Sequence, residues 1–206
     1  MSDKEHWEEL YRSNEYPWTF PDEMLVAAMN RHKPGKAIDL GAGEGGNSFW
    51  LAEKGWDVTS IDQSAAAVEF IRSESDKKGY SIKAEAGDVL SYTSEDTFDL
   101  VLIAYVHLAQ QDRRLLFEKV AQLLSDHGIL IYLGLYKEDS GLPEGARADE
   151  FPGSMLIADD MTRTDELVIV EQENIQQRLP IGHMEGFYEG VTAKVIAKKG
   201  SGMNEK

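Results

Sequence analysis

The segment Asp39-Leu40-Gly41-Ala42-Gly43-Glu44-Gly45-Gly46 decides the fold of this chain. It follows a short apolar run at 36–40 that predicts a strand, and it leads into 45–54, which predicts a helix closed by Gly55. Glycines at such a junction let the backbone turn sharply and approach a ligand with no Cβ in the way. The helix that follows presents free N–H groups to a polar or anionic ligand. The segment therefore predicts a strand–turn–helix unit that binds a ligand closely.

The residues beyond this turn continue to alternate between strand and helix patterns. Ser64 is expected to cap one helix, and a second helix is expected to begin at Asp112. These two helices lie between apolar strand patterns. The strands are expected at 56–62, 80–86, 98–106 and 128–136, and the helices at 65–78 and 112–124. Strands separated by helices of about ten or more residues imply βαβ units and a parallel sheet covered on both faces.

The two ends of the chain have different patterns. Two helices, 2–13 and 23–32, are expected before the first strand. After the fifth strand, residues 137–153 read as a long loop and 155–166 contain a short helix pattern. Two strand patterns without a helix between them then predict an antiparallel pair at the sheet edge, at 167–176 and 191–199.

The chain is expected to form a single domain with three parts. Residues 1–34 would form an N-terminal helical cap and 36–136 the cofactor-binding core. Residues 137–200 would supply a loop on the substrate side and the C-terminal antiparallel strands.

Composition limits the possible partners of this 206-residue chain. It has 37 acidic and 21 basic residues and a formal net charge of −16, which repels the phosphates of nucleic acids and favours a small-molecule partner. Cysteine is absent, so disulfides, thiolate metal sites and a cysteine nucleophile are excluded, and no cluster of histidines and carboxylates predicts a metal. No apolar run approaches the roughly 18 residues of a membrane span, and no signal peptide is visible. A cytoplasmic location without membrane binding is expected, whereas the oligomeric state is not indicated.

Two cofactors compete for the glycine turn. Gly41, Gly43 and Gly46 satisfy the dinucleotide pattern G-x-G-x-x-G, and Asp62 follows near the position of its ribose-binding acid. Asp39, however, stands two residues before the first glycine, where a carboxylate would repel a pyrophosphate. S-adenosylmethionine has no phosphate, and its sulfonium and ammonium groups would be attracted by a carboxylate. The residues therefore favour S-adenosylmethionine over NAD.

Four features in chain order resemble the class I S-adenosylmethionine-dependent methyltransferases. The segment 39–45 resembles their first motif, D/E-x-G-x-G-x-G, and Asp62 ends the second strand as does their ribose-binding acid. Gly87-Asp88-Val89 is similar to their acidic position at the adenine amino group, and Phe98-Asp99-Leu100-Val101-Leu102 to the start of their fourth strand. The resemblance implies a Rossmann-like α/β fold, with a mainly parallel seven-stranded sheet, an antiparallel final strand and helices on both faces.

The N-terminal stretch resembles a narrower group. Trp7, Tyr11-Arg12 and Pro17-Trp18 are similar to the W-x-x-x-Y-R…P-W opening of small bacterial methyltransferases of the tellurite-resistance and thiopurine types. Tyr11, Arg12 and Trp18 are therefore expected to fold over the cofactor, with Arg12 pairing its carboxylate. Core packing of the aromatic side chains is an equal alternative.

The resemblance also implies contacts along the rest of the cofactor. Asp62 would accept both ribose hydroxyls, and Gln63 would lie against the adenine face. Asp88 would accept from the adenine amino group, while the N–H of Val89 donates to a ring nitrogen; an ordinary turn at Asp88 is the alternative. The methionine end would be wrapped by further residues, which are Asp39, Gly41, Ala42 and Gly43, with the carbonyl of Ala104 on the ammonium group.

The expected reaction is in-line transfer of a methyl group from S-adenosylmethionine to a small-molecule acceptor. His107, just beyond the fourth strand, is the candidate general base, although a structural histidine would occupy the same place. Two alternatives stay open: an NAD(P)-dependent oxidoreductase, and a noncatalytic domain that binds S-adenosylmethionine.

Overall fold

The computed structural model describes residues 3–13, 16–137, 147–180 and 186–200. The chain divides into two compact units. The first comprises Met1–Tyr92 and Leu179–Tyr188, and the second comprises Thr93–Arg178 and Glu189–Lys206. The division falls inside the stretch 36–136 that the sequence suggests as one core.

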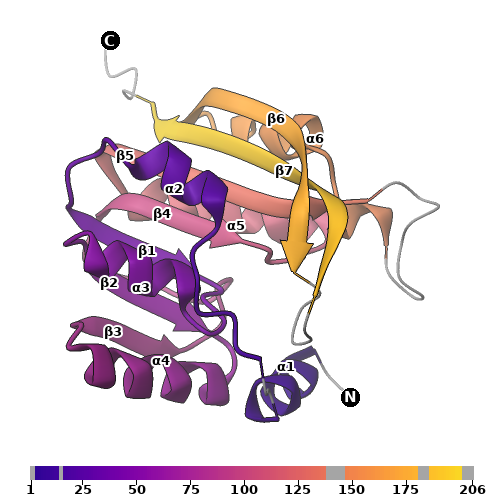
Figure 1. Ribbon diagram of the computed structural model, residues 1–206. Helices are drawn as coiled ribbons and strands as arrows, with labels where there is room; N and C mark the ends of the chain where they lie inside the picture. The colour runs from indigo at the N-terminus through magenta and orange to yellow at the C-terminus, as the bar shows by residue number, and fades with distance from the viewer. Residues whose placement is uncertain (1–2, 14–15, 138–146, 181–185, 201–206) are drawn as a thin grey trace. The chain divides into compact units, whose positions relative to one another are not determined.

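Among its described residues, the first unit contains three parallel strands on which two of its helices pack (Figure 1). Its elements are α1 (Asp3–Arg12), α2 (Glu23–Met29), β1 (Lys36–Leu40), α3 (Gly46–Glu53), β2 (Asp57–Asp62), α4 (Ala65–Lys78) and β3 (Ile82–Ala86). In the register of the strands, Asp39 lies opposite Ser60 and Asp62 opposite Ala86. The unit therefore places the end of each strand beside the end of its neighbour.

Two helices of this unit, α2 and α4, begin at residues whose side chains accept from free backbone N–H groups. Asp22 accepts a hydrogen bond from Met24 N–H at 2.7 Å, and Ser64 accepts one from Ala67 N–H at 3.3 Å. Gly79 closes α4 with a positive φ of 70°, a conformation that glycine adopts without strain. Both caps and the end of α4 are as the sequence predicts, but α2 stops at Met29 instead of continuing to His32.

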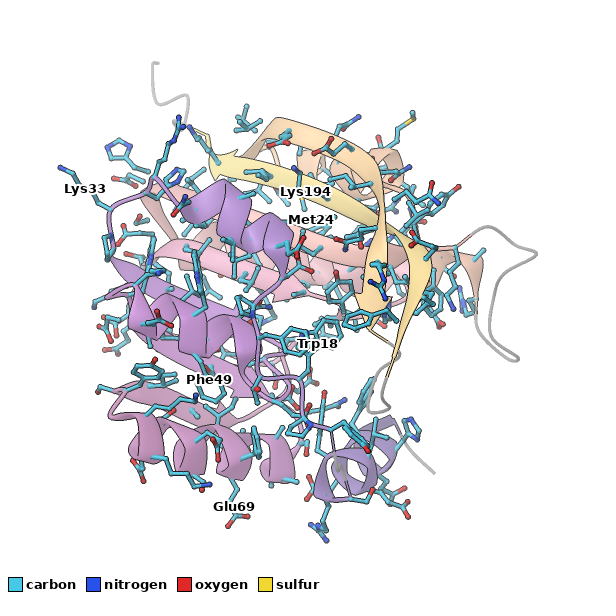
Figure 2. The ribbon with its side chains drawn as sticks, viewed as in Figure 1. Trp18, Met24, Lys33, Phe49, Glu69 and Lys194 are labelled. Carbon is cyan, nitrogen blue, oxygen red and sulfur yellow. The ribbon has the colours of Figure 1, made fainter. Side chains whose placement is uncertain are left out.

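The core of the first unit lies between the helices and the strands. Phe49 of α3 is buried with Val68 and Ile71 of α4 and Ala84 of β3. Figure 2 shows Glu69 on the opposite side of α4, where it points away from the sheet. One face of α4 is thus apolar and buried, which fixes this helix on β2 and β3.

In the part of the second unit that the structure describes, there are longer strands and two α-helices (Figure 1). Its elements are β4 (Phe98–Ala104), α5 (Gln110–Leu123), β5 (Leu124–Tyr136), the 3₁₀ turn η2 (Ala148–Glu150), α6 (Ser154–Thr162) and most of β6 (Leu167–Pro180) and β7 (Phe187–Lys199). Strands β4 and β5 are parallel, whereas β7 runs antiparallel to β5. Helix α5 packs on β4 and β5, and α6 packs on α5.

Two elements of the second unit begin earlier than their local sequence suggests. Helix α5 begins at Gln110, because the distant Asp149 carboxylate accepts the Gln110 N–H at 2.9 Å. Strand β5 begins at Leu124, directly after α5, and reaches the register of its neighbour through an irregularity between Phe98 and Leu100 of β4. In both cases a partner that is remote in sequence sets the boundary.

The strand order through the sheet is β3-β2-β1-β4-β5-β7-β6. The predicted mainly parallel sheet of seven strands with an antiparallel final strand is confirmed. Among the described residues, no helix is long and apolar enough to cross a membrane.

Gly46 is required by the close packing of α3 on the Phe20 backbone. A Cβ on Gly46 would lie 2.4 Å from the Phe20 carbonyl oxygen, whereas one on Gly87 would meet only a methyl group of Ile61 at an ordinary 3.6 Å. We expect Gly46→Ala to lower the free energy of unfolding by roughly 1–3 kcal/mol and Gly87→Ala to change it by much less. Urea denaturation of both variants tests this, and equal effects would contradict it.

Candidate cofactor and acceptor sites

The turn between β1 and α3 is bound to the end of β2. Gly41, Gly43 and Gly45 have φ values of 78°, 53° and 80°, which side chains with a Cβ rarely adopt. The N–H groups of Gly41 and Ala42 both donate to the Ile61 carbonyl oxygen, at 2.8 and 3.0 Å. The turn is therefore a built structure with backbone conformations that only its glycines supply easily.

Asp39 lies buried at the base of this turn. Its Oδ2 accepts a hydrogen bond from Ser48 Oγ at 2.7 Å, and Ser60 Oγ donates in turn to Ser48 Oγ at 2.8 Å. Its Oδ1 has no hydrogen-bond partner among the described residues. Burial raises the pKa of Asp39 to about 7; the Ser48 hydrogen bond opposes this rise and the nearby Asp62 carboxylate adds to it. A buried carboxylate oxygen without a donor is suited to a cationic ligand.

Asp62 links the turn to the start of α4. Its Oδ2 accepts from Gly43 N–H at 2.8 Å, and its Oδ1 accepts from Ser64 N–H at 2.9 Å. Burial raises the pKa of Asp62, and these two backbone hydrogen bonds oppose that rise. The carboxylate is thus fixed in direction by two N–H groups, while each oxygen keeps capacity to accept a further hydrogen bond. Gln63 follows it and is half-buried.

The segment after β3 lies beside the end of β2. Gly87 N–H donates to the Asp62 carbonyl oxygen at 2.8 Å, so the two strand ends are joined. Asp88 is exposed and its Oδ1 accepts from Leu90 N–H at 2.9 Å, which is the ordinary turn considered from the sequence. This hydrogen bond engages one oxygen of Asp88. Val89 is half-buried.

Tyr11 and Trp18 belong to the N-terminal segment and contact residues of the glycine turn. A Cβ on Gly43 would lie 3.0 Å from Tyr11 Oη, which shows how closely this ring approaches the turn. Burial raises the pKa of Tyr11, and the Asp62 and Glu44 carboxylates raise it further. The N–H of Trp18 donates to Glu44 Oε2 at 2.7 Å (Trp18 is labelled in Figure 2). The structure therefore brings Tyr11 and Trp18 to the residues predicted to bind the cofactor.

Glu8 and Glu44 are two residues of this region that sequence reasoning missed. Glu8 Oε2 accepts from Ser64 Oγ at 2.6 Å and from Ala66 N–H at 3.1 Å, so α1 caps α4. These hydrogen bonds, with Arg12, lower the pKa of Glu8. Arg12 is mostly exposed and pairs with Glu8 Oε1 at 2.6 Å. No local pattern marks an acid that binds backbone groups more than twenty positions away.

The second unit carries Ala104 and the segment after β4. Ala104 ends the strand, and Tyr105 follows with a φ of 59°, a strained value for a residue with a side chain. Gln177 Nε2 donates to Tyr105 Oη at 3.3 Å and to Thr192 Oγ1 at 2.8 Å. The strained backbone at Tyr105 is thus accompanied by a side chain fixed from both β6 and β7.

His107 is half-buried in the same unit. Its Nδ1 lies 3.3 Å from the Glu150 carbonyl oxygen, and its ring packs against Phe151 with centroids 4.5 Å apart. Burial lowers the pKa of His107 to about 4, and the charge of Lys137 lowers it further, against the effect of the Glu150 carbonyl. The imidazole is neutral near pH 7. Because a carbonyl oxygen only accepts, this contact requires the proton on Nδ1 and leaves the lone pair on Nε2.

The described residues contain no group of three or more histidine, cysteine or acidic side chains that could hold a metal ion.

Comparison with known families matches residues 37–128 to the family described as "Methyltransferase domain". This part of the chain is therefore similar to a methyltransferase domain. The matched segment begins in β1 and includes the glycine turn, Asp62, Asp88 and His107.

Curated relatives carry the same kind of domain in longer proteins. "Ribosomal RNA small subunit methyltransferase C" of Alcanivorax borkumensis is 41% identical over 71 residues, which are 33% of this chain and 22% of the relative. "Probable S-adenosyl-L-methionine-dependent methyltransferase TehB" of Haemophilus influenzae (strain 10810) is 29% identical over 100 residues, 48% of this chain and 35% of the relative. The alignments thus span about a fifth to a third of these relatives, so their substrates are not transferred with the domain.

Solved structures show the same fold over nearly the whole chain. One, from work on the conversion of a disulfide bond into a thioacetal group during echinomycin biosynthesis, has a TM-score of 0.81, 18% identity and coverage of 96% of this chain and 92% of the other. The N-methyltransferase NodS of Bradyrhizobium japonicum, in complex with S-adenosyl-L-homocysteine, has a TM-score of 0.72, 18% identity and coverage of 96% and 99%. The predicted resemblance to class I S-adenosylmethionine-dependent methyltransferases, similar to TehB, is confirmed.

The pKa of Asp39 predicts how cofactor binding depends on pH. A cationic ligand attracts the ionised carboxylate only, and protonation proceeds as the pH falls through about 7. We expect the Kd for S-adenosylmethionine to rise as the pH falls from 7.5 to 5.5, by up to about tenfold per pH unit. In Asp39→Asn, binding should be weaker at pH 7.5 and nearly independent of pH.

Isothermal titration calorimetry measures both Kd profiles. Asp57→Asn is the matched control, since Asp57 is an exposed aspartate at the far end of β2, and it should keep the pH dependence of the unaltered protein. An equal pH dependence in Asp39→Asn would assign the titration to another group.

Proposed function

We propose that this chain is an enzyme that transfers the methyl group of S-adenosylmethionine to a small-molecule acceptor. The observation that carries the proposal is the pair of buried carboxylates at the glycine turn. Asp39 presents an oxygen that has no donor among the described residues, and Asp62 is fixed by the N–H groups of Gly43 and Ser64. A cationic methionine end and a ribose diol are the two groups that such carboxylates would recognise.

Each residue at the turn has a role in this proposal. The open oxygen of Asp39 attracts the positive charge, and Gly41, Ala42 and Gly43 surround the methionine end. Asp62 accepts from the ribose hydroxyls through the free capacity of its two fixed oxygens. A carboxylate that had to change its orientation on binding would bind the diol less tightly. The two backbone N–H groups hold Asp62 in one orientation before the ligand binds.

The adenine and the outer face of the cofactor are assigned to neighbouring residues. Asp88 accepts from the adenine amino group with the oxygen that Leu90 leaves free, Val89 N–H donates to the ring, and Gln63 lies against its face. Tyr11 and Trp18 cover the turn. Arg12 would have to exchange its partner Glu8 to bind the cofactor carboxylate.

The chemistry needs little from the protein beyond position and a dry site. S-adenosylmethionine supplies a methyl group on a positively charged sulfur, and the charge disappears on transfer. Residues that align the acceptor and exclude water can therefore provide much of the acceleration. His107, neutral with its lone pair on Nε2, is the candidate that accepts a proton from the acceptor.

The net charge supports a small acceptor rather than a nucleic acid. At −16 the protein repels a phosphate backbone, although a relative of the matched domain is named as a ribosomal RNA methyltransferase. Relatives and structural neighbours named for other acceptors include the cypemycin N-terminal methyltransferase and NodS. A cytoplasmic location stays a prediction from the sequence.

Removal of the Asp62 carboxylate tests the ribose contact. We expect Asp62→Ala to weaken binding of S-adenosylhomocysteine more than tenfold, or about 1.4 kcal/mol, because the diol loses its acceptor. Calorimetry with the 2′-deoxy analogue separates this contact from damage to the turn. The unaltered protein should distinguish the two ligands, and Asp62→Ala should bind both about equally weakly.

Asp57→Ala is the control and should bind both ligands like the unaltered protein. If Asp62→Ala still prefers the ribose form by the original factor, Asp62 does not contact the diol.

A ligand panel decides between the proposed enzyme and its two alternatives. We expect S-adenosylmethionine and S-adenosylhomocysteine to bind at micromolar to low millimolar levels and NAD not to bind, because Asp39 repels a pyrophosphate. Calorimetry measures the three affinities. Release of S-adenosylhomocysteine, followed by mass spectrometry over a panel of amine, thiol, selenol and hydroxyl acceptors, separates an enzyme from a binding domain. NAD binding without either adenosyl ligand would refute the proposal.

A further inference from the structure

Arg113 is a buried residue of α5 that bridges the two backbone segments beside His107. Only 1% of Arg113 is exposed. Its Nη1 donates to the carbonyl oxygens of Leu108, at 3.1 Å, and of Asp149, at 2.7 Å. Leu108 directly follows His107, and Asp149 directly precedes Glu150, whose carbonyl contacts the imidazole. Arg113 therefore joins the chain on both sides of the His107–Glu150 contact.

Asp160 of α6 fixes the direction of the Arg113 guanidinium. It is fully buried, and its Oδ2 accepts from Arg113 Nε at 3.1 Å and Nη2 at 2.6 Å. Its Oδ1 accepts from Arg114 Nε at 2.7 Å and from Gln110 Nε2 at 3.0 Å. Because Oδ2 engages both Nε and Nη2 on one side of the guanidinium, Nη1 is left to point at the two carbonyls.

Stability alone is a weak reason for such a pair. Removing two charges from water offsets much of their attraction, and apolar side chains of similar size often stabilise a fold as well or better. What apolar residues could not do is bind two carbonyl oxygens from separate segments in one fixed arrangement. The feature that depends on Arg113 and Asp160 is therefore the placement of the backbone around His107.

The surroundings of His107 depend on the same placement. Asp149 also accepts the Gln110 N–H, so the turn at 148–150 is bound twice to the start of α5. Phe151 packs against the imidazole. Lys137 Nζ lies over the Phe151 ring, 5.5 Å from its centroid. The Nδ1 hydrogen bond, the apolar cover and the nearby charge all require that 148–151 stay where Arg113 binds it.

We propose that Arg113, fixed by Asp160, is a positioning residue that sets the tautomer of His107 and thereby makes Nε2 the proton-accepting nitrogen of the site. The proposal rests on the methyl-transfer function proposed above. The step assigned to His107 is a proton transfer: the proton leaves the acceptor atom, which keeps the bonding electrons, and the Nε2 lone pair forms the new N–H bond. Arg113 does not take part in the transfer and acts only through the backbone.

Nitrogen-15 NMR of the 206-residue chain tests the proposal without any acceptor. Long-range proton–nitrogen spectra identify the protonated nitrogen of each of the five histidines, and loss of signals in His107→Gln assigns His107. In the unaltered protein we expect the proton on Nδ1 and a pKa well below 6.5. In Arg113→Lys, which keeps the charge opposite Asp160 but loses the Nη1 contacts, the tautomers should mix and the pKa should move up toward 6.5.

Arg114→Lys is the matched control. Arg114 also pairs with Asp160 but makes neither carbonyl contact, so this variant should keep the tautomer and titration of the unaltered protein. Asp160→Asn provides a second, isosteric variant should Arg113→Lys not fold, and a partial loss of the Nδ1–H tautomer is expected there.

Two results would overturn the proposal: a proton on Nε2 in the unaltered protein, or an unchanged tautomer and titration in a folded Arg113→Lys or Asp160→Asn. Neither depends on methyl transfer. Failure of the proposed function would instead appear as absence of S-adenosylmethionine binding or of product release while the His107 tautomer is as expected.

Discussion

The hydrogen bond from Gly43 N–H to the Asp62 carboxylate connects the two strand ends on which the first unit depends. It joins the turn after β1 to the end of β2, and the other oxygen of the same side chain accepts from Ser64, where α4 begins. A buried carboxylate is costly unless donors compensate it, so the turn has to present its N–H group there. Gly43 does so with a φ of 53°, and the Tyr11 hydroxyl occupies the space beside it.

The N-terminal segment is attached by the same kind of interaction. Glu8 accepts from the start of α4, and Glu44 accepts from the Trp18 backbone. Carboxylates are favoured at the N-terminus of a helix, where the backbone dipoles leave a partial positive charge. The acidic side chains of the first unit therefore have two roles that the net charge of −16 does not distinguish. Some accept hydrogen bonds from backbone N–H groups, whereas Asp39 has an oxygen with no donor among the described residues.

The fold was predictable because its signals are local. Strand and helix patterns alternate around the glycine turn, Ser64 and Asp22 cap the helices that follow them, and Gly79 ends α4 as expected. Boundaries were missed where the determining partner is distant, as at Gln110, which Asp149 caps from almost forty positions away. The sequence likewise predicted Asp39 and Asp62 as cofactor-binding residues, because one lies in a contiguous motif and the other ends a strand. No local pattern marked Glu8 or Glu44 as an acceptor for distant N–H groups.

Arg113 and Asp160 extend this distinction to the second unit. The sequence does not indicate that these two residues pair, because an ion pair between two helices far apart in the chain follows no characteristic sequence spacing. In the first unit, carboxylates bind backbone N–H groups; around His107, a guanidinium binds backbone carbonyls. Both fix irregular backbone that carries candidate functional groups. Glu8, Arg113 and Asp160 lie outside the quoted motifs, and their contacts emerge only from the packed structure.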